Sequence, residues 1–251
     1  MTFDRRRYAR DNYTYLLVEG EDAALVDPGD PEVALALAAA HGARPRFVLH
    51  THGHGDHTGG TAEVVRRTGA VVHGHAADAG WYAPDVDVSG RAEVALGALR
   101  LRVHEVPGHT PGSVLYEWGG RLLTGDTLFW GGCGNCKHGG DPARLARSFS
   151  AVISRLDGAL AVHPGHDYAA TNLSFALDLE PGNRAARAQL EAARGARARG
   201  EEPAPTSLDD ERRANPFLRP AALVPALAAR GIEVRGEEQA FLALRRLKDS
   251  W

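Results

Sequence analysis

The stretch Thr51-His52-Gly53-His54-Gly55-Asp56-His57 places three histidines and an aspartate within seven residues, directly after a short apolar stretch. In an extended loop the side chains of His52 and His54 point to the same side, because side chains alternate along such a chain. If the chain then enters a helix, Asp56 and His57 lie at its start and face a second point. Imidazole and carboxylate groups are ligands of divalent cations such as Zn²⁺. The heptapeptide therefore predicts a metal site at the end of a strand.

The alternative for this heptapeptide is a solvated polar loop without a metal. Four ligand-type side chains packed so closely would then repel one another or stay unused, which favours the metal site. We interpret Gly53 and Gly55 as positions where a side chain would crowd the bound ions.

Three further loops carry a histidine or an aspartate just after a predicted strand. These residues are His109, Asp126, and His163 and His166 in the third loop. Loops that leave the ends of strands in one sheet can bring their side chains to one site. A single histidine in such a place is more often a capping or surface group, but three of them together with the heptapeptide indicate a shared site.

Strand and helix patterns alternate over the first 170 residues. Strands are predicted at 13–18, 23–26, 47–49, 71–72, 99–103, 113–118, 121–124 and 159–162, and helices at 31–41, at 61–68 and from Asp141 onward. From Asn172 the pattern is almost entirely helical. We expect an α/β metal-binding catalytic domain over residues 1–170 and an all-α domain over residues 171–251. The second is too small to be stable alone, so it should pack on the first.

The composition sets limits on the class of protein. Of 251 residues, 43% are hydrophobic, which is too many for a mainly disordered chain. The longest apolar run has about eight residues, too few for a membrane helix. No apolar stretch follows Arg5-Arg6-Arg7, so no secretory signal is predicted, and these arginines are interpreted as a solvated terminus. With only two cysteines there is no disulfide framework. We expect a soluble cytoplasmic protein.

The charge balance argues against nucleic-acid binding, and so against a nuclease, because the net charge is −3. The charge is uneven, however. Residues 181–251 carry +3 and residues 1–180 carry −6. The excess of cations in the helical part is explained either by ordinary solvated helix faces or by a surface that binds an anionic small molecule.

The order HxHxDH, followed by His, Asp and His in separate loops, resembles the metallo-β-lactamase superfamily. Further stretches resemble glyoxalase II (hydroxyacylglutathione hydrolase) over nearly the whole chain: Asp11-Asn12-Tyr13, Val26-Asp27-Pro28, Asn172 to Ala176, Glu180 to Asn183, Asn215 to Arg219 and Leu244 to Asp249. The resemblance implies an αββα sandwich followed by a smaller all-α substrate-binding domain.

The resemblance also implies two divalent metal ions, with Zn²⁺ expected first and Fe or Mn as alternatives for the same ligands. His52, His54 and His109 would hold one ion. Asp56, His57 and His166 would hold the other, and Asp126 would bridge the two.

The mechanism expected from such a site is thioester hydrolysis. A water between two divalent cations loses a proton near neutral pH. The hydroxide can attack an acyl carbon without a serine or cysteine nucleophile, and it releases a carboxylic acid and a thiol. Asp56, which would orient the hydroxide, and Asp126 are the expected catalytic residues.

The resemblance implies S-lactoylglutathione as the substrate, but the substrate loop departs from the family. At residues 132–139 the family lysine is replaced by Asn135, and the family tyrosine by Lys137. Tyr168 and Arg219 still match family residues near the glutathione. We expect these four residues to contact the substrate, with a non-glutathione thioester as the alternative.

Two other functions are open. A mononuclear-iron persulfide dioxygenase of the same superfamily would use His52, His54 or His109 with Asp126, although the helical tail favours the hydrolase. A non-catalytic scaffold is disfavoured because every expected ligand is present.

Several residues near the expected site stay open. The pair Cys133 and Cys136 is interpreted as loop residues beside the active site, with a reversible disulfide as the alternative. The pair Trp81-Tyr82 is expected to cover the edge of the site or to pack, and His138 is undecided. The oligomeric state is not predicted.

Overall fold

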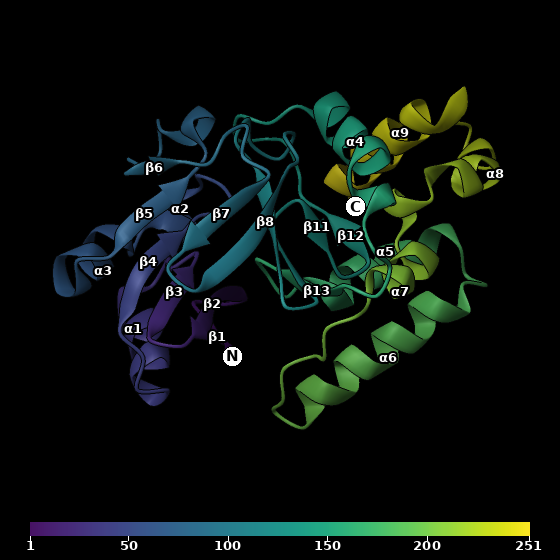
Figure 1. Cartoon of the computed structure of the whole chain (residues 1–251). Helices are drawn as coiled ribbons and strands as arrows, with labels where there is room; N and C mark the ends of the chain where they lie inside the picture. The colour runs from purple at the N-terminus through teal and green to yellow at the C-terminus, as the bar shows by residue number, and fades with distance from the viewer.

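Two β-sheets face each other at the centre of the molecule, and helices cover their outer faces (Figure 1). The structure is a computed structural model that describes residues 1–251. One sheet has six strands in sequence order: β1 (Thr2–Tyr8), β2 (Asn12–Glu19), β3 (Asp22–Val26), β4 (Pro45–Leu49), β5 (Val71–Gly74) and β6 (Val86–Asp87). The other has the order β13 (Ala161–Pro164), β10 (Arg121–Gly125), β9 (Val114–Trp118), β8 (Leu99–Glu105) and β7 (Glu93–Leu96). A two-stranded hairpin, β11 (Leu128–Phe129) with β12 (Gly132–Cys133), follows β10.

The helices are α1 (Pro31–Ala40), α2 (Gly55–Thr58), α3 (Thr61–Thr68), α4 (Pro142–Ala151), α5 (Ala169–Leu179), α6 (Arg184–Ala198), α7 (Leu208–Ala214), α8 (Val224–Ala228) and α9 (Gly236–Ser250). Short 3₁₀ turns lie at Ala76–Asp78, Ile153–Arg155, Pro216–Leu218 and Pro220–Leu223. None of the helices combines the length and the apolar character needed to cross a bilayer.

Side chains along a strand point alternately to its two faces, and this alternation explains the layers of the fold. In β2, Tyr15 and Leu17 belong to a large core between the sheets, whereas Leu16 belongs to a smaller core with Leu37 of α1. Because successive side chains point to opposite faces, one apolar strand can serve both cores. The predicted αββα sandwich is therefore confirmed.

The large core continues into the helical region. It contains Leu123 of β10 together with Leu173 of α5 and Phe241 of α9. The ring of Phe241 lies 5.1 Å from that of Phe149 in α4 and 5.3 Å from that of Phe217. The helices after residue 170 thus bury their apolar faces against the sandwich, as expected for a helical part too small to fold alone. The division at residue 170 stays a prediction.

Arg5, Arg6 and Arg7, predicted to be a solvated terminus, lie in β1 and pair antiparallel with β2, with Arg5 opposite Tyr15. Arg6 and Arg7 are exposed, as expected. Arg5 is not, because its guanidinium lies over the Tyr13 ring at 4.9 Å and donates to the Pro203 carbonyl. The sequence also gave no signal for β7, which forms the edge of the second sheet.

Candidate active site

Four loops meet where strands of both sheets end. The heptapeptide follows β4, and its last residues open the one-turn helix α2, as predicted. The loops after β8, β10 and β13 bring His109, Asp126 and His166 to the same place. Residues far apart in sequence therefore converge, and all seven predicted metal ligands lie in one cluster.

The first group within the cluster is His52, His54 and His109. One ring nitrogen from each lies within 4.8 Å of the others. His109 Nε2 and His54 Nδ1 are 3.0 Å apart.

The second group is Asp56, His57 and His166, again within 4.8 Å of one another. His57 Nε2 and His166 Nε2 are 3.1 Å apart, and Asp56 Oδ2 is 3.3 Å from His166 Nε2.

Asp126 lies between the two groups. Its Oδ2 is 3.6 Å from His109 Nε2 and 3.3 Å from His166 Nε2, and its Oδ1 is 3.4 Å from His57 Nε2. One carboxylate thus reaches ligands of both groups, the position expected for a bridging group.

The chemistry of the cluster fits divalent cations. His52 Nε2 and Asp126 Oδ1 are buried without a hydrogen-bond partner, a costly state unless another group binds them. Burial and the neighbouring imidazoles lower the pKa of His52. Burial also lowers the pKa of His166, but the carboxylates of Asp126, Asp56 and Asp11 outweigh it and raise that pKa to about 11. A cation would take the place of such protons, since a metal ligand must be deprotonated.

Groups behind the ligands hold them in position. His166 Nδ1 donates to Asp11 Oδ1 (2.8 Å), and Asn12 Nδ2 donates to Asp56 Oδ2 (2.9 Å). His109 Nδ1 donates to the carbonyl oxygen of Asn135 (2.7 Å). Such bonds fix the tautomer of a histidine and aim its other nitrogen at the metal. The sequence showed Asp11-Asn12 only as part of a matching stretch, without this role.

Asp27 is a further residue whose role the sequence did not reveal. It is buried, has φ = +49°, and lies 3.2 Å from His57 Nδ1 through Oδ2. Thr51 donates to it from its backbone N (2.9 Å) and from Oγ1 (2.6 Å). Burial would raise the pKa of Asp27, but the imidazoles of His50 and His57, 3.6 and 3.2 Å from its oxygens, hold it well below its usual value. A left-handed backbone at a non-glycine residue is strained, and this network holds it in place.

The structure gives a different reason for glycine at positions 53 and 55 of the heptapeptide than the predicted crowding of bound ions. A β-carbon at Gly53 would lie 2.7 Å from the Trp81 ring, and one at Gly55 would meet nothing within 4 Å. Gly53 therefore makes room for Trp81 rather than for an ion. The cluster requires glycine at two other positions. A β-carbon at Gly165 would collide with Asp126 Oδ1 and lie 2.7 Å from His57 Cε1, and one at Gly134 would lie 2.7 Å from His109 Nδ1.

The cluster opens into a hollow of about 390 Å³, here called the metal hollow. Asn135, Tyr168 and His138 line it. A second hollow of about 270 Å³ shares Phe129, Asn135 and Tyr168 with it. Because the second hollow is also lined by Lys137, Arg245 and Lys248, it is called the cationic hollow.

Three of the four predicted substrate residues line these hollows. The fourth, Arg219, lines neither, and its guanidinium pairs with the Glu180 carboxylate. Arg245 and Lys248 were not predicted as site residues. They lie three residues apart on α9, so both project from one face of the helix. Burial lowers the pKa of Lys248 to about 8. The net positive charge of residues 181–251 was the signal that could have indicated them.

A buried network ties the hairpin β11–β12 to the helical region. Asn215 Nδ2 donates to the carbonyl oxygens of Phe129 (3.2 Å) and Gly132 (2.9 Å). Glu211 Oε2 accepts from Gly131 N (2.8 Å). Phe129, held in this way, lines both hollows and meets the Tyr168 ring at 5.2 Å. The helical region thereby positions a wall of the site.

The two cysteines are free. Cys133 lies in β12 rather than in a loop, is buried, and accepts a hydrogen bond from Arg245. Burial raises the pKa of Cys133 to about 11 and that of Cys136 to about 12. Thiols with such pKa values are unreactive at neutral pH.

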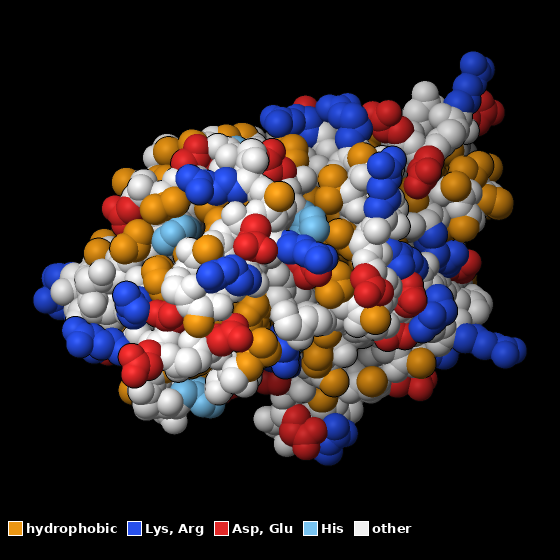
Figure 2. Space-filling model, in the orientation of Figure 1, with side chains coloured by type: hydrophobic (Ala, Val, Ile, Leu, Met, Phe, Trp, Pro, Cys, Tyr) orange, Lys and Arg blue, Asp and Glu red, His pale blue; other side chains and the backbone are white.

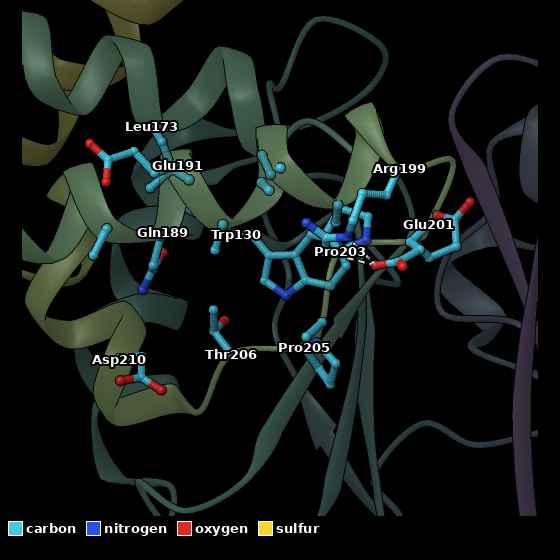
Figure 3. A pocket seen from close by; sticks show the side chains of 18 residues that line it. Trp130, Leu173, Gln189, Glu191, Arg199, Glu201, Pro203, Pro205, Thr206 and Asp210 are labelled. Carbon is cyan, nitrogen blue, oxygen red and sulfur yellow. Dashed lines mark hydrogen bonds and ion pairs between the residues drawn. The ribbon is translucent and has the colours of Figure 1, made fainter.

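A larger hollow, of about 560 Å³, lies elsewhere (Figure 3). It is formed by α5, α6 and the segment 201–206, with Trp130 and Leu173 among its apolar lining. None of the three groups of metal-ligand side chains lies in it, so size alone does not identify the site. On the face seen in Figure 2, basic and acidic side chains are interspersed.

Comparison with known proteins agrees with this geometry. Residues 7–166 match the metallo-beta-lactamase superfamily, and residues 167–251 match the hydroxyacylglutathione hydrolase C-terminus. A hydroxyacylglutathione hydrolase of Anaeromyxobacter dehalogenans is 68% identical over 99% of both chains. This chain belongs to the hydroxyacylglutathione hydrolase family. The family, as part of the metallo-β-lactamase superfamily, implies a dinuclear metal site, which matches the two groups of ligands joined by Asp126.

Solved structures show the same fold. The BLEG-1 B3 metallo-beta-lactamase has a TM-score of 0.69 at 22% identity, covering 87% of this chain and 100% of its own. TTHA1623, crystallised in a di-iron-bound form, has a TM-score of 0.62 at 29% identity, covering 82% of this chain and 95% of its own. In this member of the family, the sandwich is thus a shared scaffold, and the substrate loop and α9 carry the individual features.

Proposed function

We propose that this chain, a thioester hydrolase by its family, cleaves the thioester of glutathione, with S-lactoylglutathione as the first candidate substrate. The observation that supports this most is the junction of two hollows. The cluster of seven ligand side chains opens directly beside a hollow lined by Lys137, Arg245 and Lys248, with one carboxylate, Asp249, that accepts from Arg245 (2.9 Å) and leaves the lining net positive. An anionic thiol such as glutathione can bind its carboxylates there while its thioester reaches the cluster.

The two groups of ligands would hold two divalent cations, His52, His54 and His109 one and Asp56, His57 and His166 the other, with Asp126 shared. When bound, such ions polarise the thioester carbonyl and lower the pKa of water. We propose Zn²⁺ for both sites, and iron is the alternative, because the di-iron form of TTHA1623 shows that this fold can hold it. Elemental analysis of the purified protein, expected to give two metal ions per chain, distinguishes the two.

The protein's own side chains orient the reacting groups. Asp56 lines the metal hollow, and Asn12 holds its Oδ2. From there Asp56 accepts a hydrogen bond from the attacking water and aims it at the acyl carbon. Tyr168 stacks on the His166 ring at 4.8 Å. Burial raises the pKa of Tyr168, so it stays a neutral phenol that can donate a hydrogen bond to the thiol portion.

Wild-type protein with bound metal is expected to hydrolyse S-lactoylglutathione, measured as the loss of the thioester absorbance. His54→Ala should lose nearly all of this activity. If the wild type turns over a thioester of an uncharged thiol at the same kcat/KM, glutathione is not selected and the non-glutathione alternative holds.

Replacing Lys248 by methionine tests the cationic hollow. The loss of one charge-assisted contact is expected to raise KM for a glutathione thioester about tenfold while kcat changes little. A thioester of an uncharged thiol should show no such change. Arg246→Met, an exposed position on the same helix, is the matched control. Equal effects of the two substitutions would contradict the role of Lys248.

Both ligand groups are complete, which favours the hydrolase over a persulfide dioxygenase with one iron. Such a dioxygenase would not use Asp56, His57 and His166.

We further propose that residues 1–170 form the catalytic domain and residues 171–251 the substrate-binding domain. Since both cysteines are free, the cytoplasm is the proposed compartment.

A further inference from the structure

An exposed tryptophan packs against His54, one of the residues that line the metal hollow. Trp81 is 44% exposed, and its indole meets the His54 ring edge-on, with centroids 5.8 Å apart and planes at 85°. The His138 ring lies 6.1 Å from His54. His54 and His138 line the metal hollow but not the cationic hollow. Trp81, His54 and His138 are here called the aromatic rim.

The indole of Trp81 is held against two backbone segments. A β-carbon at Gly53 would lie 2.7 Å from Trp81 Cε3, and one at Gly139 would lie 3.1 Å from Cη2. Gly53 belongs to the heptapeptide, and Gly139 lies next to His138. Glycine at both positions lets the ring approach the chain on either side. The indole ring is therefore fixed relative to the metal-ligand side chains. A ring that is already fixed loses less conformational entropy when a small molecule binds to it.

Packing alone does not explain the exposure of this ring. Only five large hydrophobic side chains of the molecule are exposed: Met1, Val71, Trp81, Tyr168 and Trp251. Of these, Tyr168 lines the metal hollow where it joins the cationic hollow, and Trp81 lies one side chain away, against the lining residue His54. Exposed aromatic surface at the mouth of a polar site is typical of a ligand contact.

This inference rests on the proposed thioester hydrolysis. In that reaction the two parts of the substrate, the thiol portion and the acyl group, would lie at different ends of the joined hollows. If the thiol portion binds Lys137, Arg245 and Lys248, and the carbonyl lies at the ligand cluster, the acyl group extends toward the aromatic rim. We propose that Trp81 is a specificity-determining residue that stacks on the acyl group and favours thioesters whose acyl group carries an aromatic ring.

The test compares two thioesters of one thiol, S-lactoylglutathione and S-mandeloylglutathione, which differ by a methyl and a phenyl group. Aromatic stacking changes affinity by about 0.5–1.5 kcal/mol, so the ratio of kcat/KM for mandeloyl over lactoyl should fall roughly fivefold in Trp81→Ala. Trp81→Leu, apolar but without a ring, should show the same fall, and Trp81→Phe should retain most of the ratio. Val71→Ala, at another exposed apolar residue, should leave the ratio unchanged.

A ratio that is unchanged in both Trp81→Ala and Trp81→Leu would overturn the proposal, and so would an equal loss for both thioesters, which would mark Trp81 as merely structural. The proposed function fails in a different way, namely if wild-type protein hydrolyses neither thioester.

Discussion

Replacing Asp126 by alanine is expected to lower kcat/KM for the thioester about 10³-fold, because several kcal/mol of transition-state stabilisation depend on an intact pair of ions. Asp126 is a buried carboxylate, and its oxygens lie within 4 Å of ligand nitrogens from both groups. Its oxygens lie among four imidazoles, and although burial raises its pKa, the histidines, His166 first, lower it to about 2. It is therefore ionised at any pH at which the enzyme works.

The measurement is steady-state kinetics together with the metal content of the purified variant, which should fall below two ions per chain. Asp126→Asn keeps the shape but not the charge, and is expected to be nearly as inactive. Asp178→Ala, at an exposed aspartate paired with Arg230, is the control and should retain wild-type activity. Full turnover in Asp126→Ala would end the account of a shared carboxylate.

Replacing Asn215 by alanine is expected to destabilise the protein by about 3 kcal/mol. The side chain is fully buried, and its loss leaves the carbonyl oxygens of Phe129 and Gly132 without their donor. It also removes the acceptor of the Phe217 N–H, 3.0 Å away. Since these groups hold the hairpin β11–β12, KM for the thioester should rise as well.

Thermal unfolding and kinetics together check this prediction, and Asn183→Ala is the matched control. Asn183 is also a buried asparagine, but it caps α6 through a bond from Ala186 N (3.0 Å). Loss of a cap costs about 1 kcal/mol, so this variant should be less stable without a change in KM. If both variants leave KM unchanged, the network around Asn215 is structural and does not position the site.

The residue patterns predicted an α/β domain because their signals are local, and the resemblance to a family supplied the sandwich. The strand residues of β2 and the capping residue Asp30 with Pro31 at the start of α1 depend on neighbours within a few residues. β1 was not predicted because three arginines indicate a solvated segment. The rings that cover Arg5 belong to Tyr13 and Trp130, which lie outside β1.

The candidate site divides in the same way. The spacing within the heptapeptide identified four ligand-type side chains directly. The resemblance to a family supplied the roles of the other three and the prediction of Arg219 as a substrate contact. In the structure Arg219 pairs with Glu180, and Arg245 and Lys248 line the cationic hollow. The neighbouring sequence of a Lys or Arg on a helix does not show what its side chain faces, because that depends on how the helix packs.

The sequence by itself determined the α/β class and the four ligand-type side chains of the heptapeptide, because these rest on residue type and short spacing, and its longer matches indicated the family. Only the tertiary structure decided which side chains meet: Asp126 between the two groups, Asp11, Asn12 and Asp27 behind the ligands, and α9 beside the substrate loop. The physical reason is that such contacts join residues 24 to 155 positions apart. Their geometry is fixed by the packing of the whole core rather than by any short stretch of chain.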